Sequence, residues 1–156
     1  MELKARLRTH YKYFLNNFQT RWSDNDQYGH VNNAIYYHYY DTIINQYLTT
    51  RCSLIPTRSP HIGLCVHSSS DYFRPIEFPA TLDLALAVTK LGKSSVTYEI
   101  GVFETGKEDV CAVGSFVHVF VESAGRRPVA IEGEIRTGLQ QLVVERESDE
   151  DKASKL

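Results

Sequence analysis

The residues best suited to chemistry gather in one short stretch of the chain. They are two carboxylates, a glycine, an imidazole and two side-chain amides: Asp24, Asp26, Gly29, His30, Asn32 and Asn33. A carboxylate can act as a general base or as a nucleophile. The N–H groups at the start of a helix carry partial positive charge and can polarise a carbonyl oxygen. A helix that begins after this stretch would complete a site for attack on a carbonyl carbon.

The sequence around this stretch predicts the elements that hold it. Residues 11–22 mix aromatic and polar positions, which we interpret as a strand. Asn32 or Asn33 can cap a helix that ends near Thr50. The buried stripe of this helix recurs at helical spacing: Tyr36, Tyr40, Ile43, Ile44 and Tyr47.

From Ile62 onward the hydrophobic pattern alternates with a period of two. Residues 82–88, 96–102 and 117–121 predict long strands joined by short links, which is typical of an antiparallel sheet. Residues 132–144 predict a second helix. A long helix after the first strand, followed by a four-strand meander, indicates an α+β fold with the helix packed on one sheet face.

The stretch from Asp24 to Asn33 resembles the signature of one enzyme family. It fills every position of the pattern D-x-D-x-x-G-H-V-N-N and is followed by a tyrosine-bearing helix. This is the signature of the hotdog-fold acyl-CoA thioesterases of the 4-hydroxybenzoyl-CoA thioesterase family, and the resemblance covers roughly residues 10 to 145. It implies the hotdog fold, in which an antiparallel sheet wraps around a long central helix.

The resemblance also implies a reaction and a role for each residue. The reaction is acyl-CoA plus water giving a free acid and coenzyme A. Asp26 would be the general base or the nucleophile, and the backbone N–H near Asn33 would polarise the thioester oxygen. Gly29 would let the backbone turn and approach the substrate. His30 could hydrogen-bond Asp26 or help the thiolate leave.

Other residues near the motif have plainer interpretations. Asp24 and Asp26 are also common turn residues, and for Asp24 we prefer a role in holding the loop. Asp41, on the predicted helix, is a secondary candidate for the active site. Tyr36 is a candidate to line the acyl tunnel, although the tyrosines surround the helix and cannot all face one pocket.

Coenzyme A would need contacts for its phosphates. The strand turn with Lys93, Ser94 and Ser95 resembles a pattern of the family, and Arg74 is a further candidate. A solvated basic turn explains each of these residues equally well. No metal or redox cofactor is implied. The family builds its active site between two protomers, so we expect a homodimer, with further pairing into a tetramer open.

Length and composition exclude several classes. The chain has 156 residues, 17 basic and 19 acidic side chains, and a net charge of −2. This length fits one domain, and the charge argues against a nucleic-acid-binding protein. No apolar run is long enough to span a membrane. The three cysteines form no C-x-x-C motif and the first residues show no secretory signal, so we expect a reducing intracellular compartment.

The end of the sequence suggests a location. We expect residues 1–144 to form the hotdog domain and residues 145–156 to form a flexible charged tail. Its final residues, Ser154, Lys155 and Leu156, match the peroxisomal import tripeptide. This match predicts the peroxisomal matrix as the location and the import receptor as a partner.

Two other functions stay open from the sequence. A hotdog enoyl-CoA hydratase would resemble D-x-N-x-x-H, but here Asp26 fills the third position and Gly29 precedes His30. A non-catalytic acyl-CoA-binding protein would use the same fold without turnover. An α/β-hydrolase thioesterase is excluded because the sequence has no G-x-S-x-G motif.

Overall fold

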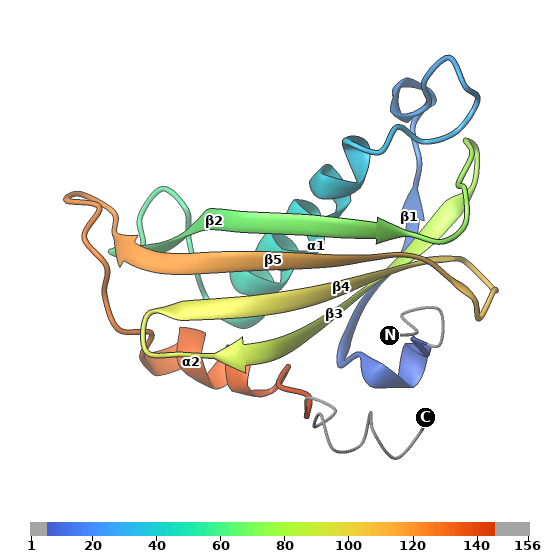
Figure 1. Cartoon of the computed structure of the whole chain (residues 1–156). Helices are drawn as coiled ribbons and strands as arrows, with labels where there is room; N and C mark the ends of the chain where they lie inside the picture. The colour runs from blue at the N-terminus through green and yellow to red at the C-terminus, as the bar shows by residue number, and fades with distance from the viewer. Residues whose placement is uncertain (1–5, 146–156) are drawn as a thin grey trace.

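The computed structural model describes residues 6–145. Within this range the elements are η2 (Arg8–His10), β1 (Tyr13–Gln19), η3 (Trp22–Asp24), α1 (Ile35–Arg51), β2 (His61–Tyr72), β3 (Thr81–Leu91), β4 (Ser95–Glu104), β5 (Val110–Glu122) and α2 (Gly133–Gln140). The described strands form a five-stranded antiparallel sheet in the order β1-β3-β4-β5-β2. Helix α1 packs on this sheet (Figure 1), which confirms the expected α+β arrangement.

Helix α1 forms because one of its faces is aromatic and aliphatic. Its buried residues recur every three or four positions: Tyr36, Tyr39, Tyr40, Ile43, Ile44, Tyr47 and Leu48. They pack against side chains of β3 and β4 such as Leu84 and Ile100. Full burial of such an apolar side chain contributes about 1.5–3 kcal/mol. The helix is therefore held rigidly on the sheet and can position the loop that precedes it.

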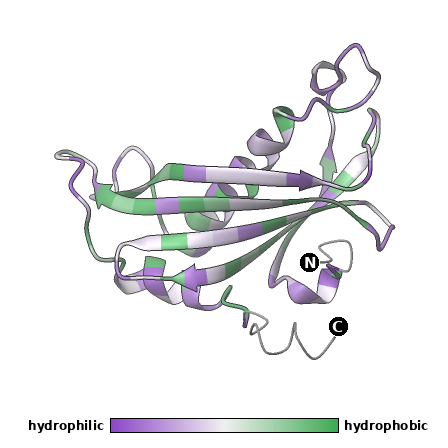
Figure 2. Ribbon diagram, in the orientation of Figure 1, coloured by the Kyte–Doolittle hydropathy of each residue, from purple (hydrophilic) through white to green (hydrophobic). Residues whose placement is uncertain are grey.

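The opposite face of the sheet is covered in part. A second, smaller core holds residues of the first described segment and of β3, β4 and β5: Tyr11, Ala85, Ala87, Phe103, Val110 and Val113. Residues 82–88 are all buried as a result, although the sequence predicted alternating exposure there. Figure 2 shows hydrophobic residues along the central strands, whereas the segment between β1 and α1 is largely hydrophilic.

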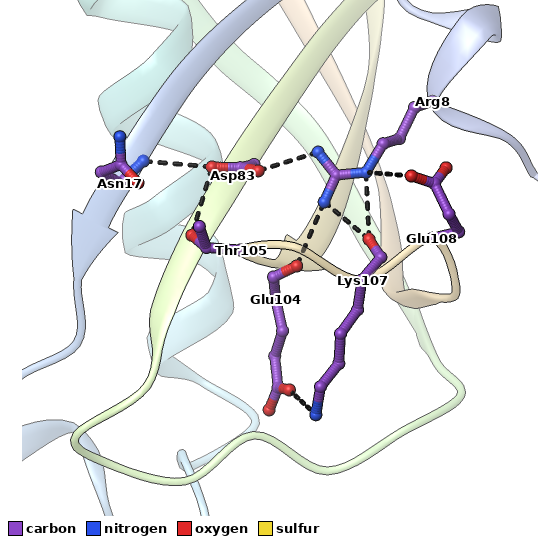
Figure 3. A network of polar contacts seen from close by, with 7 residues as sticks. All are labelled: Arg8, Asn17, Asp83, Glu104, Thr105, Lys107 and Glu108. Carbon is purple, nitrogen blue, oxygen red and sulfur yellow. Dashed lines mark hydrogen bonds and ion pairs between the residues drawn. The ribbon is translucent and has the colours of Figure 1, made fainter.

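A partly buried ion pair fastens the first described residues to the sheet (Figure 3). The Arg8 guanidinium donates to Asp83 Oδ2 at 2.8 Å and to the backbone oxygens of Glu104 and Lys107 at 3.1 and 2.6 Å. It also lies 4.7 Å from the centre of the Phe103 ring, in a cation–π arrangement. These contacts join η2 to β3 and to the β4–β5 hairpin.

The same carboxylate bonds an irregular point of β1, which is shorter than the predicted strand of residues 11–22. The pairing of β1 with β3 shifts between Leu15 and Phe18, which marks a bulge. Asn17 lies in this bulge with φ at 57°, and its N–H donates to Asp83 Oδ1 at 3.1 Å. Beyond Gln19 the chain leaves the sheet and enters the loop toward α1.

The second helix is also shorter than predicted. The sequence predicted residues 132–144, but α2 ends at Gln140. The Val88 N–H donates to the oxygen of Leu142 at 2.8 Å, and the Val144 N–H donates to the oxygen of Val88 at 2.9 Å. Strand β1 pairs with β3 only as far as Leu86, so the end of β3 offers free hydrogen-bonding groups that compete with the helix.

Strand β2 does not extend a four-strand meander. Strands β3, β4 and β5 are joined as consecutive hairpins, whereas β2 pairs with β5 along its length, from His61–Glu122 to Tyr72–Ala112. Strand β2 therefore lies at an edge, and its outer side pairs with no strand within residues 6–145. No helix in this part of the chain is long and apolar enough to cross a membrane. The predicted domain boundary at residue 144 stays a prediction, because residues 146–156 lie outside the described range.

Candidate active site

The loop between β1 and α1 is held by a buried carboxylate. Asp24 is fully buried and accepts hydrogen bonds from the Arg21 N–H at 2.9 Å, from Arg21 Nε at 3.0 Å and from the Tyr39 hydroxyl at 2.7 Å. Burial acts to raise the pKa of the Asp24 carboxyl. The three bonds and the Arg21 charge outweigh burial, so this pKa lies below its usual range. Asp24 joins the loop to the second turn of α1, which agrees with the predicted holding role.

Asp26 lies two residues further along and is partly exposed. Its Oδ1 accepts from the Tyr28 N–H at 2.8 Å, and its Oδ2 accepts from Asn32 Nδ2 at 3.0 Å. One donor on each oxygen orients the carboxylate and leaves further lone pairs available. A carboxylate held in this way can take a proton or attack a carbon atom.

Gly29 and His30 close the loop around Asp26. The Gly29 N–H donates to the Asp26 oxygen at 3.1 Å, and the Asp26 N–H donates to the His30 oxygen at 3.0 Å. Gly29 has φ at 85°, which favours glycine, although no atom lies within 4 Å of the place where a Cβ would stand. The His30 side chain is exposed and forms no hydrogen bond within the described chain. The expected side-chain bond from His30 to Asp26 is therefore absent there, and assistance to the leaving thiolate stays a prediction.

The head of α1 is organised by Asn32. Its Oδ1 accepts from the Ala34 N–H at 3.0 Å, and its backbone oxygen accepts from the Ile35 N–H at 2.9 Å. This tight turn delays the helix, which begins at Ile35 and so later than a cap at Asn32 or Asn33 predicts.

At Asn33, the backbone carbonyl is hydrogen-bonded and the backbone N–H is not, within the described residues. The Asn33 carbonyl accepts from the Tyr72 hydroxyl at 2.8 Å. The Asn33 N–H makes no hydrogen bond to another residue in the range 6–145. This N–H stands at the positive end of α1 and can donate to an anionic or polarised oxygen.

Tyr36 and Arg74 lie at the same end of the sheet as this loop. Tyr36 is buried in the first turn of α1. The Tyr72 ring packs edge-on against its ring, with 5.0 Å between the two ring centroids. Burial raises the pKa of the Tyr36 phenol, so it stays neutral. Arg74 follows β2 and pairs with Asp109 at 3.0 Å, with both side chains exposed.

The segment after Arg74 runs beside the loop. The Val31 N–H donates to the Ile76 oxygen at 2.7 Å, and the Phe78 N–H donates to Asn25 Oδ1 at 3.2 Å. The Trp22 and Phe78 rings meet edge-on at 5.9 Å. Most of the predicted site residues thus come together at one end of the molecule.

Lys93, Ser94 and Ser95 lie at the other end. Lys93 and Ser94 lie in the β3–β4 turn and Ser95 begins β4. The Lys93 oxygen accepts from the Ile131 N–H at 2.7 Å, and the Ser94 oxygen accepts from the Phe120 N–H at 2.8 Å. Strand β3 has 11 residues and separates this turn from the loop. At about 3.3 Å per residue this is roughly 35 Å. A single chain does not bring these residues to Asp26.

One further candidate from the sequence, Asp41, lies outside this hydrogen-bonded group. Asp41 is exposed on α1, and its Oδ1 accepts from Asn45 Nδ2 at 2.9 Å. Within residues 6–145, no three His, Cys, Asp or Glu side chains gather into a possible metal site.

Sequence reasoning missed two partners of this site. Tyr39 was not part of the predicted stripe, yet its hydroxyl holds Asp24. Tyr72 bonds Asn33 across 39 residues of sequence, and no local pattern signals that contact. Its place as the last residue of β2, opposite the head of α1, depends on how the helix crosses the sheet.

An antiparallel sheet packed on a long helix, with a carboxylate loop at the helix start, defines a hotdog-fold thioesterase. The chain belongs to the thioesterase superfamily, which matches residues 28–111. This protein is accordingly a hydrolase of thioesters.

Solved structures agree with this assignment. The PA5185 protein from Pseudomonas aeruginosa strain PAO1 is 49% identical with a TM-score of 0.85, and the match covers 88% of this chain and 95% of that one. A thioesterase complexed with coenzyme A and Zn from Thermus thermophilus is 27% identical with a TM-score of 0.72, covering 85% and 95%. A 1,4-dihydroxy-2-naphthoyl-CoA thioesterase from Synechocystis shares the fold at 16% identity and a TM-score of 0.71, covering 85% and 96%. No curated protein matches the sequence.

Proposed function

We propose that this protein hydrolyses acyl-CoA thioesters to a free acid and coenzyme A. The observation that carries the proposal is the position of Asp26. Its carboxylate is oriented by two donors on the loop that leads into α1, and the Asn33 N–H, which has no bond within residues 6–145, stands at the head of that helix. The pair supplies a base or nucleophile and a donor for the thioester oxygen.

Two routes use these groups. In one, Asp26 takes a proton from water, the hydroxide adds to the thioester carbon, the C–S bond breaks, and the thiolate leaves and is protonated. In the other, an Asp26 oxygen adds to the carbon and expels the thiolate, and water then cleaves the mixed anhydride. In both routes the Asn33 N–H stabilises the oxyanion, which is worth about 3–4 kcal/mol for one such donor.

Coenzyme A as the carrier is supported by two comparisons. The Thermus thermophilus thioesterase was solved with coenzyme A, and the Synechocystis protein is named as a CoA thioesterase. We propose Arg74, Lys93, Ser94 and Ser95 as contacts for the phosphates, with Gly29 and Tyr36 facing the acyl part. The proposed chemistry requires no metal or redox cofactor, so dialysis against EDTA is expected to leave turnover unchanged.

A homodimer is part of this proposal. Arg74 follows β2 at the end of the sheet where the loop with Asp26 lies, whereas Lys93 lies at the other end, so we infer that a second copy brings both groups to one substrate. Strand β2 has 12 residues and an outer side without a strand partner in the described chain, which suits pairing with a second copy. Sedimentation analysis is expected to show a dimer or a tetramer, and a monomer would contradict this arrangement.

The decisive experiment is a thiol-release assay over acetyl-, hexanoyl-, palmitoyl-, isobutyryl- and benzoyl-CoA. Asp26→Asn is expected to lower turnover about 100-fold or more while the protein stays folded. Glu108→Gln also converts a carboxylate into an amide, at a side chain that is 80% exposed in the β4–β5 hairpin. This control variant is expected to keep full turnover. Undiminished turnover in Asp26→Asn would remove this residue from the mechanism.

The same protein tests the two other functions. Loss of the enoyl absorbance of crotonyl-CoA without thiol release would favour a hydratase. Binding of acyl-CoA esters with no thiol release from any of them would indicate a binding protein.

We also propose a peroxisomal location. It rests on Ser154, Lys155 and Leu156, which match the import tripeptide and lie outside the described residues. A fluorescent protein fused ahead of the full chain is expected to enter peroxisomes, and removal of the tripeptide is expected to leave it in the cytosol. Identical distributions of the two fusions would contradict the proposal.

A further inference from the structure

The Asn32 side chain links the proposed catalytic carboxylate to the head of α1. Its Nδ2 donates to Asp26 Oδ2 at 3.0 Å, and its Oδ1 accepts from the Ala34 N–H at 3.0 Å. A reversed amide would set its oxygen against the carboxylate and its NH₂ group against the N–H, so one orientation serves both bonds. The sequence predicted a capping role, and the bond to Asp26 is more than capping requires.

We propose that Asn32 is a positioning residue. Its side chain orients the Asp26 carboxylate toward the thioester and, by occupying the Ala34 N–H, leaves the Asn33 N–H as the donor for the thioester oxygen. This inference rests on the proposed function of Asp26 and Asn33.

The Asp26 carboxylate depends on the Asn32 amide because it has only one other hydrogen-bond donor among the described residues. The Tyr28 N–H holds Oδ1, and without Asn32 the Oδ2 atom would have no donor among the described residues. The carboxylate could then rotate about its terminal torsion, which is soft. A displacement of about 1 Å at a reacting group can cost on the order of 100-fold in rate.

Asn32 also decides which helix-start N–H meets the substrate. Several N–H groups at a helix start lack partners within the helix. Asn32 takes the Ala34 N–H with its side chain and the Ile35 N–H with its backbone oxygen. The Asn33 N–H, unbonded within residues 6–145, then faces the substrate oxygen without competition from its neighbours.

Two variants separate positioning from capping. Asn32→Ser and Asn32→Asp both keep a side-chain oxygen for the Ala34 N–H, and both residues are good caps and turn formers. Neither replaces the donor to Asp26. Serine is one bond shorter, and an ionised aspartate only accepts hydrogen bonds and adds a like charge beside Asp26.

Turnover is measured with the acyl-CoA ester that releases thiol fastest in the survey described above, beside thermal unfolding of each variant. We expect kcat to fall about tenfold in Asn32→Ser and about 100-fold in Asn32→Asp, with KM within about threefold of wild type. Asn16→Asp changes the charge equally at an exposed position of β1 and is expected to keep the wild-type kcat.

The outcomes are distinct. A cap alone predicts wild-type kcat in both Asn32 variants, and that result overturns the inference while the proposed function stands. Loss of cooperative unfolding in both variants also overturns it, because Asn32 would then be required for the fold itself. A wild-type protein that releases no thiol from any ester overturns the proposed function and this inference together.

Discussion

Replacement of Arg8 by leucine should destabilise the protein substantially, although Arg8 lies outside the motif from Asp24 to Asn33. The Arg8 side chain is 20% exposed and its partner Asp83 is 9% exposed, so the ion pair is largely removed from water (Figure 3). Leucine removes the guanidinium that lies over the Phe103 ring. It removes the charged donor to Asp83 and the bonds to two backbone oxygens.

The expected loss follows from what Asp83 retains. Removing one partner of a buried ion pair costs about 3–5 kcal/mol. Asp83 keeps two neutral donors, the Asn17 N–H at 3.1 Å and the Thr105 hydroxyl at 3.3 Å. We therefore expect the free energy of unfolding to fall by about 2–3 kcal/mol, which for a chain of this size lowers Tm by roughly 5–10 °C.

The assay is urea denaturation at a fixed protein concentration, because the apparent stability of an oligomer depends on its concentration. In the double variant Arg8→Leu/Asp83→Asn, no unpaired charge is left at residue 83. Its loss of unfolding free energy should therefore be smaller than the sum of the two single-variant losses by at least about 1 kcal/mol. Arg58→Leu, at an exposed position outside this network, should stay within about 0.5 kcal/mol of wild type. A loss below about 0.5 kcal/mol in Arg8→Leu, or strict additivity in the double variant, would refute the reasoning.

Three further predictions concern pH and packing. Burial lowers the pKa of His118 to about 4, against about 6.5 in the unfolded chain, so between these values the unfolded chain binds more protons. The free energy of unfolding should then fall by up to roughly 3 kcal/mol as the pH drops from 6.5 toward 4, and urea titrations should show a shallower fall in His118→Gln. Gly114→Ala places a Cβ against the Tyr40 ring and should cost about 1–3 kcal/mol or more in thermal denaturation; an unchanged Tm would contradict this packing. Asp24→Asn removes a charged acceptor from the loop and should cost about 2 kcal/mol and lower thiol release; full activity and stability together would show that Asp24 does not hold the loop.

Patterns within one element of the sequence predicted much of the fold. The stripe of Tyr36, Tyr40 and Ile43 repeats at helical spacing and correctly predicted α1. The alternation in residues 82–88 and 96–102 correctly predicted β3 and β4. These succeed because backbone geometry alone decides which residues share a face. The ends of elements were less accurate, because there neighbouring segments compete for backbone hydrogen bonds, as at Val88.

The proposed site divides in the same way. The motif from Asp24 to Asn33 is local, so its residues were found together and the structure places them in one loop. The contacts of Tyr72 with Asn33 and of Arg8 with Asp83 span 39 and 75 residues, and no local pattern predicted them. The turn at Lys93 carries the expected residues, yet its separation from Asp26 became visible only in three dimensions.

The sequence by itself determined the carboxylate motif, the helix that follows it and the strands that carry that helix, since each is set by neighbours on the same segment. Only the tertiary structure decided that Tyr72 bonds the Asn33 carbonyl, that Lys93 lies far from Asp26, and that part of the second sheet face is covered. These features depend on strand register and on where the helix crosses the sheet, and both arise from packing between segments distant in the chain.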